Sequence, residues 1–167
     1  LLNLILSNTH DNIHIILLVN KSSIKLIEKY INKKYHKRLN LFEIQPHKIY
    51  MSILNASDII LDSYPFNGCT TTYEAFIQNK IVIGLNRQGN DYYLPEICLD
   101  GIYRELEISG LTVNTYDELV NIINVLYYNR KERTRIENII KNSAHKLFEH
   151  KESLNLYNDL FEKLHLI

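Results

Sequence analysis

The residues of this chain with the clearest chemical potential follow a short apolar run near its middle. Residues 59–61 read Ile-Ile-Leu, and a small polar turn containing Gly68 separates them from a helical pattern over residues 73–79. The first turn of a helix has N–H groups without intrahelical partners and carries the positive end of the helix dipole, so it attracts anions. Three consecutive threonines at residues 70–72 add hydroxyl donors. We therefore expect this turn to hold a phosphate without a lysine.

Glu74 lies about one helical turn beyond the start of this segment. A carboxylate at that point can accept two hydrogen bonds from a ribose diol beside the phosphates, which indicates a nucleotide site. The residues leave open a second interpretation, a capped helix without a ligand. In that case Thr70 or Thr71 is the N-cap, Glu74 is the acid of a capping box, and Gly68 serves the turn.

The wider pattern resembles the C-terminal half of a glycosyltransferase group. This group contains the O-linked N-acetylglucosamine transferases, the O-fucosyltransferases and the bacterial cytoplasmic N-glucosyltransferases. Its signature is a strand ending in Leu-Asp, a short loop with proline, Asn-Gly, one variable residue, Thr-Thr, and an acid three residues on. The matching residues here are Leu61-Asp62, Pro65, Asn67-Gly68, Cys69, Thr70-Thr71 and Glu74. The resemblance continues through residues 111–119 and the helical patterns that follow.

The resemblance implies an α/β fold with a Rossmann-like parallel sheet flanked by helices. Such a domain is the C-terminal nucleotide-binding half of a two-domain, GT-B glycosyltransferase and ends in a helical tail. We expect residues 1–167 to form a single donor-nucleotide-binding domain, of which residues 116–167 are mainly helical. Because the chain starts at Leu1 and has about half the length of a two-domain enzyme, we expect a fragment. The acceptor domain and the first strand would precede it.

Apolar runs of strand length alternate with helical patterns along the first half of the chain. Strands are predicted over residues 13–19, 41–44, 58–61, 81–85 and 111–113, and helices over residues 1–8, 22–31, 46–55 and 73–79. In the second of these helices Leu26, Ile27, Tyr30 and Ile31 are expected to face inward. Residues 92–108 are partly helical in pattern, and helices follow from residue 116 with breaks near Asn129 and His150. Runs this apolar are typical of a parallel sheet that is buried on both faces.

Ligands of an open parallel sheet bind outside the carboxyl ends of the strands. Three predicted turns lie there, at residues 45–47, 67–72 and 86–90. The resemblance implies that the first turn and the following helix hold uracil. The resulting candidate residues for nucleotide binding are Gln45, His47, Tyr50, Asn67, Gly68, Cys69, Thr70, Thr71, Thr72, Glu74 and Arg87.

Each residue of the first and third turns also has a plainer interpretation. By resemblance, Gln45 and His47 fall on base-contacting positions, and Tyr50 lies against the uracil ring. His47 can equally be a residue at the start of a helix without a role in binding, and Tyr50 can equally be a core residue. Arg87 can reach the diphosphate and stabilise the leaving nucleotide, or be an ordinary surface arginine. Asp62 can orient the turn through backbone hydrogen bonds.

The function that the resemblance implies is transfer of a sugar of the N-acetylglucosamine or glucose type from a UDP-sugar to a protein Ser, Thr or Asn. The UDP-sugar donor is the only cofactor expected. The resemblance implies that no metal is needed, and the chain has no Asp-x-Asp motif to argue otherwise. The protein or peptide acceptor and any catalytic base belong to the part before Leu1, so no catalytic residue is assigned. The alternative is a degenerate domain that binds nucleotides or partners without transferring sugar.

Composition excludes several other classes of function. The net charge is zero, which gives no electrostatic basis for binding nucleic acid or an anionic membrane. The basic run at residues 33–38 is expected to be the solvated end of a helix. Two cysteines make no disulfide framework, which favours a reducing, cytoplasmic location, and no apolar run is long enough for a membrane span. Because the resemblance implies a last helix that crosses to the other domain, Leu154, Tyr157, Phe161 and Leu164 should be partly exposed.

Overall fold

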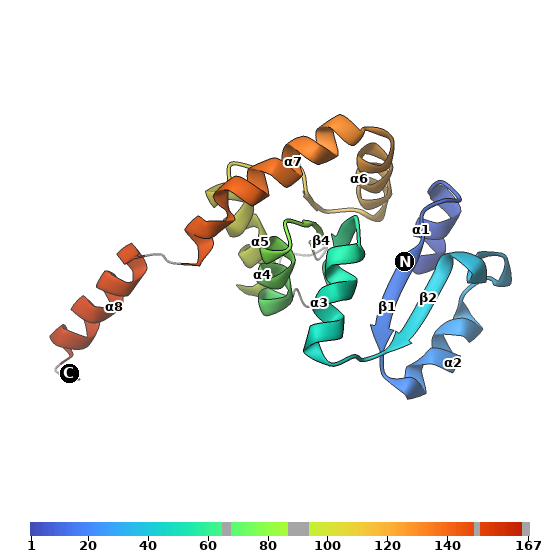
Figure 1. The fold of residues 1–167 in the computed structure, drawn as a ribbon, viewed down its shortest axis with the longest axis horizontal. Helices are drawn as coiled ribbons and strands as arrows, with labels where there is room; N and C mark the ends of the chain where they lie inside the picture. The colour runs from blue at the N-terminus through green and yellow to red at the C-terminus, as the bar shows by residue number, and fades with distance from the viewer. Residues whose placement is uncertain (65–67, 87–93, 149–150, 165–167) are drawn as a thin grey trace.

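The computed structural model describes residues 1–64, 68–86, 94–148 and 151–164, without the side chains of residues 94–98 and 151–153. Strands and helices alternate through its first half, and helices fill the second (Figure 1). The strands are β1 Ile15–Val19, β2 Leu39–Glu43, β3 Ile59–Leu61, β4 Ile81–Leu85 and β5 Thr112–Val113. The α-helices are α1 Leu2–Asn8, α2 Lys21–Tyr30, α3 His47–Ala56, α4 Cys69–Ile77, α5 Leu94–Glu105, α6 Tyr116–Tyr128, α7 Arg130–Ser143 and α8 Lys151–Lys163. Two short 3-10 helices, η1 Lys33–Arg38 and η2 Ala144–Leu147, complete the list.

All described strand pairs are parallel, as the sequence predicts, but they form two sheets. One sheet pairs β1 with β2, and the other has the order β3-β4-β5. Every residue of β4 is buried, because the strand lies between β3 and β5 and packs against α4, α6 and α7. Burial on both faces is therefore confirmed for β4.

The same expectation is wrong for β1 and β2. Ile15 is buried and Leu17 and Leu39 pack against the core, whereas Ile16 and Phe42 are exposed. Side chains alternate between the two faces of a strand, so one face of this two-stranded sheet contacts the core and the other faces solvent. Apolar composition alone did not distinguish this half-buried sheet from β4.

The inward face of α2 also differs from the prediction. Leu26 and Tyr30 are 55% and 69% exposed, while Ile27 is half-buried and Ile31, just beyond the helix, is buried. The helix begins at Lys21, and its inward stripe passes through Ile27 toward Ile31. Leu26 and Tyr30 each lie one residue before these positions, about 100° away around the helix axis.

The basic run at residues 33–38 is mostly exposed, as expected of a solvated helix end, but Arg38 is buried and corrects the expectation at that residue. Its guanidinium donates to the carbonyl oxygens of Leu6 at 2.7 Å and Ile13 at 2.9 Å, and to the hydroxyl of Thr9 at 2.8 Å. The carbonyl groups at a helix C-terminus lack intrahelical partners, so Arg38 completes the end of α1 and attaches it to β2.

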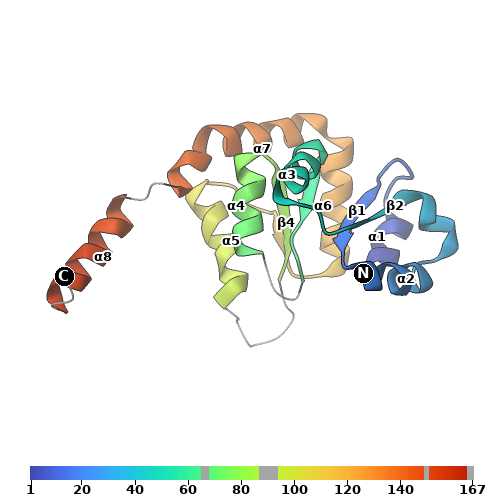
Figure 2. The ribbon, with the colours of Figure 1, turned by 60° about the horizontal axis from the view of Figure 1, so that its bottom comes forward.

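Helix α8 lies apart from the other elements in both views (Figures 1 and 2). Its described side chains are exposed, and the predicted exposure of Leu154, Tyr157, Phe161 and Leu164 is confirmed at 40% to 61%. Within the described residues no helix is both long and apolar enough to cross a membrane.

Candidate functional site

The candidate site lies where β2 and β3 lead into the helices that follow them. Gln45 is in the turn between β2 and α3, and its amide donates to the carbonyl oxygen of Glu43 at 2.8 Å. His47 is the first residue of α3, and Tyr50 follows one turn later. Helices α3 and α4 lie side by side (Figure 2), which brings the first predicted turn next to the helix that carries Glu74.

Glu74 is the centre of this arrangement. His47 Nε2 lies 2.7 Å from Glu74 Oε1, and the Tyr50 hydroxyl lies near the same carboxylate. The Glu74 side chain is 18% exposed, whereas that of His47 is 71% exposed. Burial, and then the negative charge of the nearby Glu74 carboxylate, raise the pKa of Tyr50 to about 12. Two residues of the first turn and helix thus meet the predicted ribose acceptor.

Asp62 shapes the turn between β3 and α4. Its Oδ1 accepts hydrogen bonds from the backbone N–H groups of Ser63 at 2.9 Å and Gly68 at 2.8 Å. One carboxylate oxygen thereby joins the start of the turn to its end, which is the orienting role considered from the sequence. The described part of the turn is held from the side of β3.

A glycine is required at position 68 because neighbouring side-chain atoms lie close to where a Cβ atom would be, and not because of its backbone angles. Its φ is −80°, which other residues adopt, but a Cβ atom at this position would lie 2.0 Å from Thr71 Oγ1 and 3.3 Å from Asp62 Oδ1. A side chain here would therefore displace the Thr71 hydroxyl. The glycine lets that hydroxyl lie directly over the start of α4.

The start of α4 contradicts the assignments of the capped-helix interpretation. The N-cap is Gly68 rather than a threonine, it makes no side-chain cap hydrogen bond, and Glu74 bonds to α3 instead of closing a capping box. The helix begins at Cys69, four residues before the predicted start. Thr72 is buried and donates both its backbone N–H and its hydroxyl to the Gly68 carbonyl, so its hydroxyl is used inside the helix.

The exposed residues at the start of α4 are Cys69, Thr70 and Thr71. They offer backbone amides, two hydroxyls and a thiol at the positive end of a nine-residue helix. Asn67 and Arg87, which complete the predicted set, lie outside the described residues.

Two asparagines lie at the carboxyl ends of β4 and β5; the sequence analysis included Asn86 in the third predicted turn but named neither Asn86 nor Asn114 as a candidate residue. Asn86 Nδ2 donates to Asn114 Oδ1 at 3.1 Å, and Asn114 N–H donates to Glu118 Oε2 at 2.8 Å. The available signal was positional, since both residues directly follow apolar strands at the sheet edge where ligands bind.

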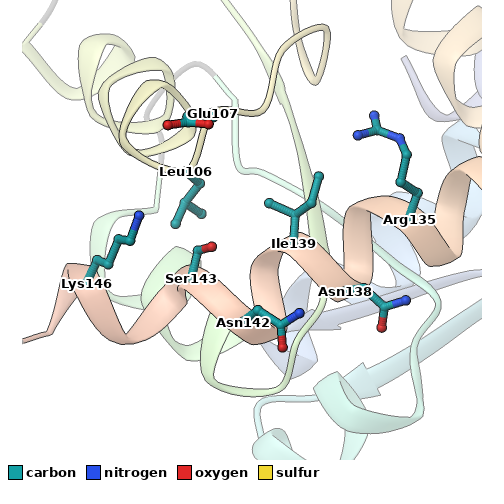
Figure 3. A pocket seen from close by; sticks show the side chains of 8 residues that line it. All are labelled: Leu106, Glu107, Arg135, Asn138, Ile139, Asn142, Ser143 and Lys146. Atoms are coloured by element: carbon teal, nitrogen blue, oxygen red, sulfur yellow. The ribbon is translucent and has the colours of Figure 1, made fainter.

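Two surface hollows of the described chain lie away from these residues. The larger, of about 650 Å³, lies between the turn after α5 and one face of α7 and η2 (Figure 3). Its lining residues are Leu106, Glu107, Arg135, Asn138, Ile139, Asn142, Ser143 and Lys146. The other, of about 460 Å³, is lined by Asn124, Val125, Tyr128 and Asn129. No residue of the predicted site lines either hollow. A search of the described part found no group of three or more His, Cys, Asp or Glu residues suited to a metal ion.

Comparison with known proteins shows which solved structures share the fold of this chain. No protein-family model matches the chain, and no curated protein does. Sixteen chains of solved structures match, among them a mutant O-GlcNAc transferase of Thermobaculum terrenum. That structure is 24% identical with a TM-score of 0.57, and the match covers 66% of this chain and 20% of that one. The chain therefore matches about a fifth of the transferase. At this identity the likeness shows the fold: parallel sheets flanked by helices, with a helical C-terminal part, as expected from the sequence.

Proposed function

We propose that this chain is the donor-nucleotide-binding part of a cytoplasmic protein glycosyltransferase. The reaction would transfer a sugar of the N-acetylglucosamine or glucose type from a UDP-sugar to a protein Ser, Thr or Asn. Residues 1–167 would form one binding domain, and the acceptor would be held by another part of the protein. The main observation in support of the proposal is that His47 and Tyr50 lie close to Glu74, beside the start of α4. The shared fold with an O-GlcNAc transferase supports it.

The diphosphate of the donor would lie at the start of α4. The backbone amides of the first turn and the hydroxyls of Thr70 and Thr71 are donors at the positive end of the helix, and Gly68 leaves room for close approach. These fixed dipoles would stabilise the negative charge that develops on the leaving nucleotide without a metal ion. Arg87 would add a positive charge from the next loop.

The nucleoside would extend from there toward α3. Glu74 would accept hydrogen bonds from the ribose diol, the ring of Tyr50 would lie against uracil, and the side-chain amide of Gln45 would reach the edge of the base. His47 would lie between base and ribose. Gln45 lies in the turn that follows β2, and His47, Tyr50 and Glu74 lie in helices α3 and α4, which fix their backbone positions.

Calorimetric titration of UDP tests the assignment. Thr71→Val removes a hydroxyl donor and Glu74→Ala removes the ribose acceptor, so each variant should bind UDP about tenfold or more weakly, as expected for a hydrogen bond to a charged group. Thr134→Val and Glu28→Ala are matched controls, because both residues are exposed on other helices, α7 and α2. Equal affinity of the parent and all four variants would contradict the site.

A binding module without transferase activity is the alternative. It predicts the same UDP affinities and differs only in the absence of sugar transfer. Incubating the full-length protein with a radiolabelled UDP-sugar and a cell extract distinguishes the two, since only the enzyme labels protein.

A further inference from the structure

The predicted ribose acceptor has a partner from α3. His47 Nε2 lies 2.7 Å from Glu74 Oε1, and the Tyr50 hydroxyl lies near the same carboxylate. Because an ionised carboxylate only accepts hydrogen bonds, the contact with His47 is a donation from α3 to α4. The contact between His47 and Glu74 is as short as charge-assisted hydrogen bonds usually are.

A ribose diol needs the same oxygen atoms. The Glu74 side chain is 18% exposed, so a ligand approaches it only from its open side, where the far more exposed His47 lies. A carboxylate offers about four lone-pair directions, but partial burial leaves few of them open to a ligand. A diol that donates two hydrogen bonds to Glu74 must therefore displace a donor from α3.

We propose that His47 and Tyr50 close the ribose site by occupying Glu74, and that a nucleoside diol opens it by exchanging with the His47 imidazole. The inference rests on the proposed function and adds its regulation. Histidine is the side chain that ordinarily changes charge between pH 5 and 8. An imidazolium holds a carboxylate more strongly than a neutral imidazole does. Acidification therefore favours the closed site and weakens nucleotide binding.

Other ionisable groups near Glu74 do not account for a pH dependence of nucleotide binding between pH 5 and 8. On α3 they are Lys48 and Tyr50, and on α4 they are Cys69, Tyr73 and Glu74 itself. At the end of β2, Glu43 forms an ion pair with Lys21 at 3.5 Å. Among these side-chain types, only a histidine ordinarily gains a proton between neutral and mildly acidic pH.

The test measures the dissociation constant of UDP-glucose by calorimetry at about pH 8 and about pH 5.5. UDP-glucose is the probe because its diphosphate is a diester and does not titrate over this range, in contrast to the terminal phosphate of UDP. The parent chain should bind about fivefold more weakly at the lower pH, the difference between a charge-assisted and a neutral hydrogen bond. Circular dichroism at both pH values verifies that the chain remains folded.

Two variants separate the roles of the donors. His47→Gln keeps a neutral donor beside Glu74 and should bind UDP-glucose with the same affinity at both pH values. Tyr50→Phe keeps the ring and removes the hydroxyl that competes for Glu74, so it should bind about threefold more tightly at both pH values. His14→Gln is the control for histidine titration elsewhere, because His14 is exposed on the residue before β1. This control should keep the full pH dependence of the parent.

The outcomes distinguish this inference from the proposed function. An equal pH dependence in the parent and His47→Gln, or none in the parent, would overturn the inference while leaving nucleotide binding intact. Absence of UDP-glucose binding by the parent and by both site variants would overturn the proposed function together with the inference. Binding by His47→Gln or Tyr50→Phe but not by the parent would support closure of the site most strongly.

Discussion

At the scale of single residues, Tyr103 of α5 completes the hydrogen bonding of β4. Strand β5 pairs only with Gly84 and Leu85, so Val82 has no strand partner on that side. The Val82 N–H donates to the Tyr103 hydroxyl at 2.9 Å, and the hydroxyl donates to the Val82 carbonyl. One buried hydroxyl thus replaces a residue of a neighbouring strand, because it is both donor and acceptor.

Replacing Tyr103 with Phe should therefore lower the free energy of unfolding by about 2–3 kcal/mol. The change leaves the Val82 N–H and carbonyl buried without partners, and each such group costs more than the net value of a hydrogen bond. Urea unfolding of the variant measures the loss. Tyr128→Phe is the control, because Tyr128 is 67% exposed, and it should stay within about 0.5 kcal/mol of the parent. Equal stability of both variants would contradict the role of the Tyr103 hydroxyl.

Alkaline pH provides a second prediction for tyrosine residues. Burial raises the pKa of Tyr103, and burial together with Glu74 raises that of Tyr50 from 10.0 to about 12. Above pH 10 the unfolded chain releases protons that the folded chain retains, so stability is complete below pH 10 and falls as the pH rises toward 12. Urea midpoints at several pH values in this range should decrease, and Tyr50→Phe should show a smaller decrease. A flat profile would contradict the prediction.

The residues around the site could be predicted from sequence to different degrees. The signature near Gly68 predicted a polar turn between a strand and a helix, and the structure has both, since those residues are close in sequence and their types are restricted by the turn itself. The role of these residues in nucleotide binding stays a prediction. Arg38 and Tyr103 could not be assigned their roles. Their partners lie 21 to 32 residues away, and only the folded chain brings such groups together.

At the scale of elements, the start of α4 depends on the fit between Gly68 and Thr71. A Cβ atom on residue 68 would lie 2.0 Å from Thr71 Oγ1, while the other neighbours are at 3.3 Å or more. The threonine hydroxyl can rotate to its second helical rotamer, so the backbone need not move. The consequence of a substitution should therefore fall on the hydroxyl and much less on the fold.

Gly68→Ala should accordingly leave stability within about 1 kcal/mol of the parent and weaken UDP binding about tenfold, as Thr71→Val does. The double variant Gly68→Ala/Thr71→Val should bind no more weakly than either single variant, because both changes remove one interaction. Calorimetric titration of the three variants with UDP measures the coupling free energy between residues 68 and 71 in UDP binding. Additive losses would show that the two residues act separately.

Helices and strands were predicted best where the hydrophobic pattern was long and both faces of the element are buried. Strand β4 was predicted with the correct bounds because both of its faces are buried. Helix α4 was predicted to start four residues too late, since its first turn is polar and reads as a loop. For β1 and β2 the strands were correct and their burial was not, because apolar runs do not reveal which neighbours cover them.

At the scale of the whole molecule, α8 makes little contribution to the packed core. Its described residues are exposed, and none belongs to the buried cluster that joins α1, β4, α5, α6 and α7. Removing residues 149–167 should therefore change the thermal midpoint of the remaining chain by only a few degrees, because little apolar area leaves a buried environment. Differential scanning calorimetry of the shortened chain measures this. A large decrease would show that α8 packs on the body in solution.

The most direct measurement of the central claim is protection of Cys69 by nucleotide. Cys69 is exposed at the first residue of α4, where the diphosphate would lie, and Cys98→Ser leaves it as the only cysteine of the chain. UDP should slow alkylation of Cys69 by iodoacetamide in a saturable manner, and uridine, which lacks phosphates, should protect it far less. An alkylation rate unchanged up to millimolar UDP would contradict the claim that the start of α4 holds a nucleoside diphosphate.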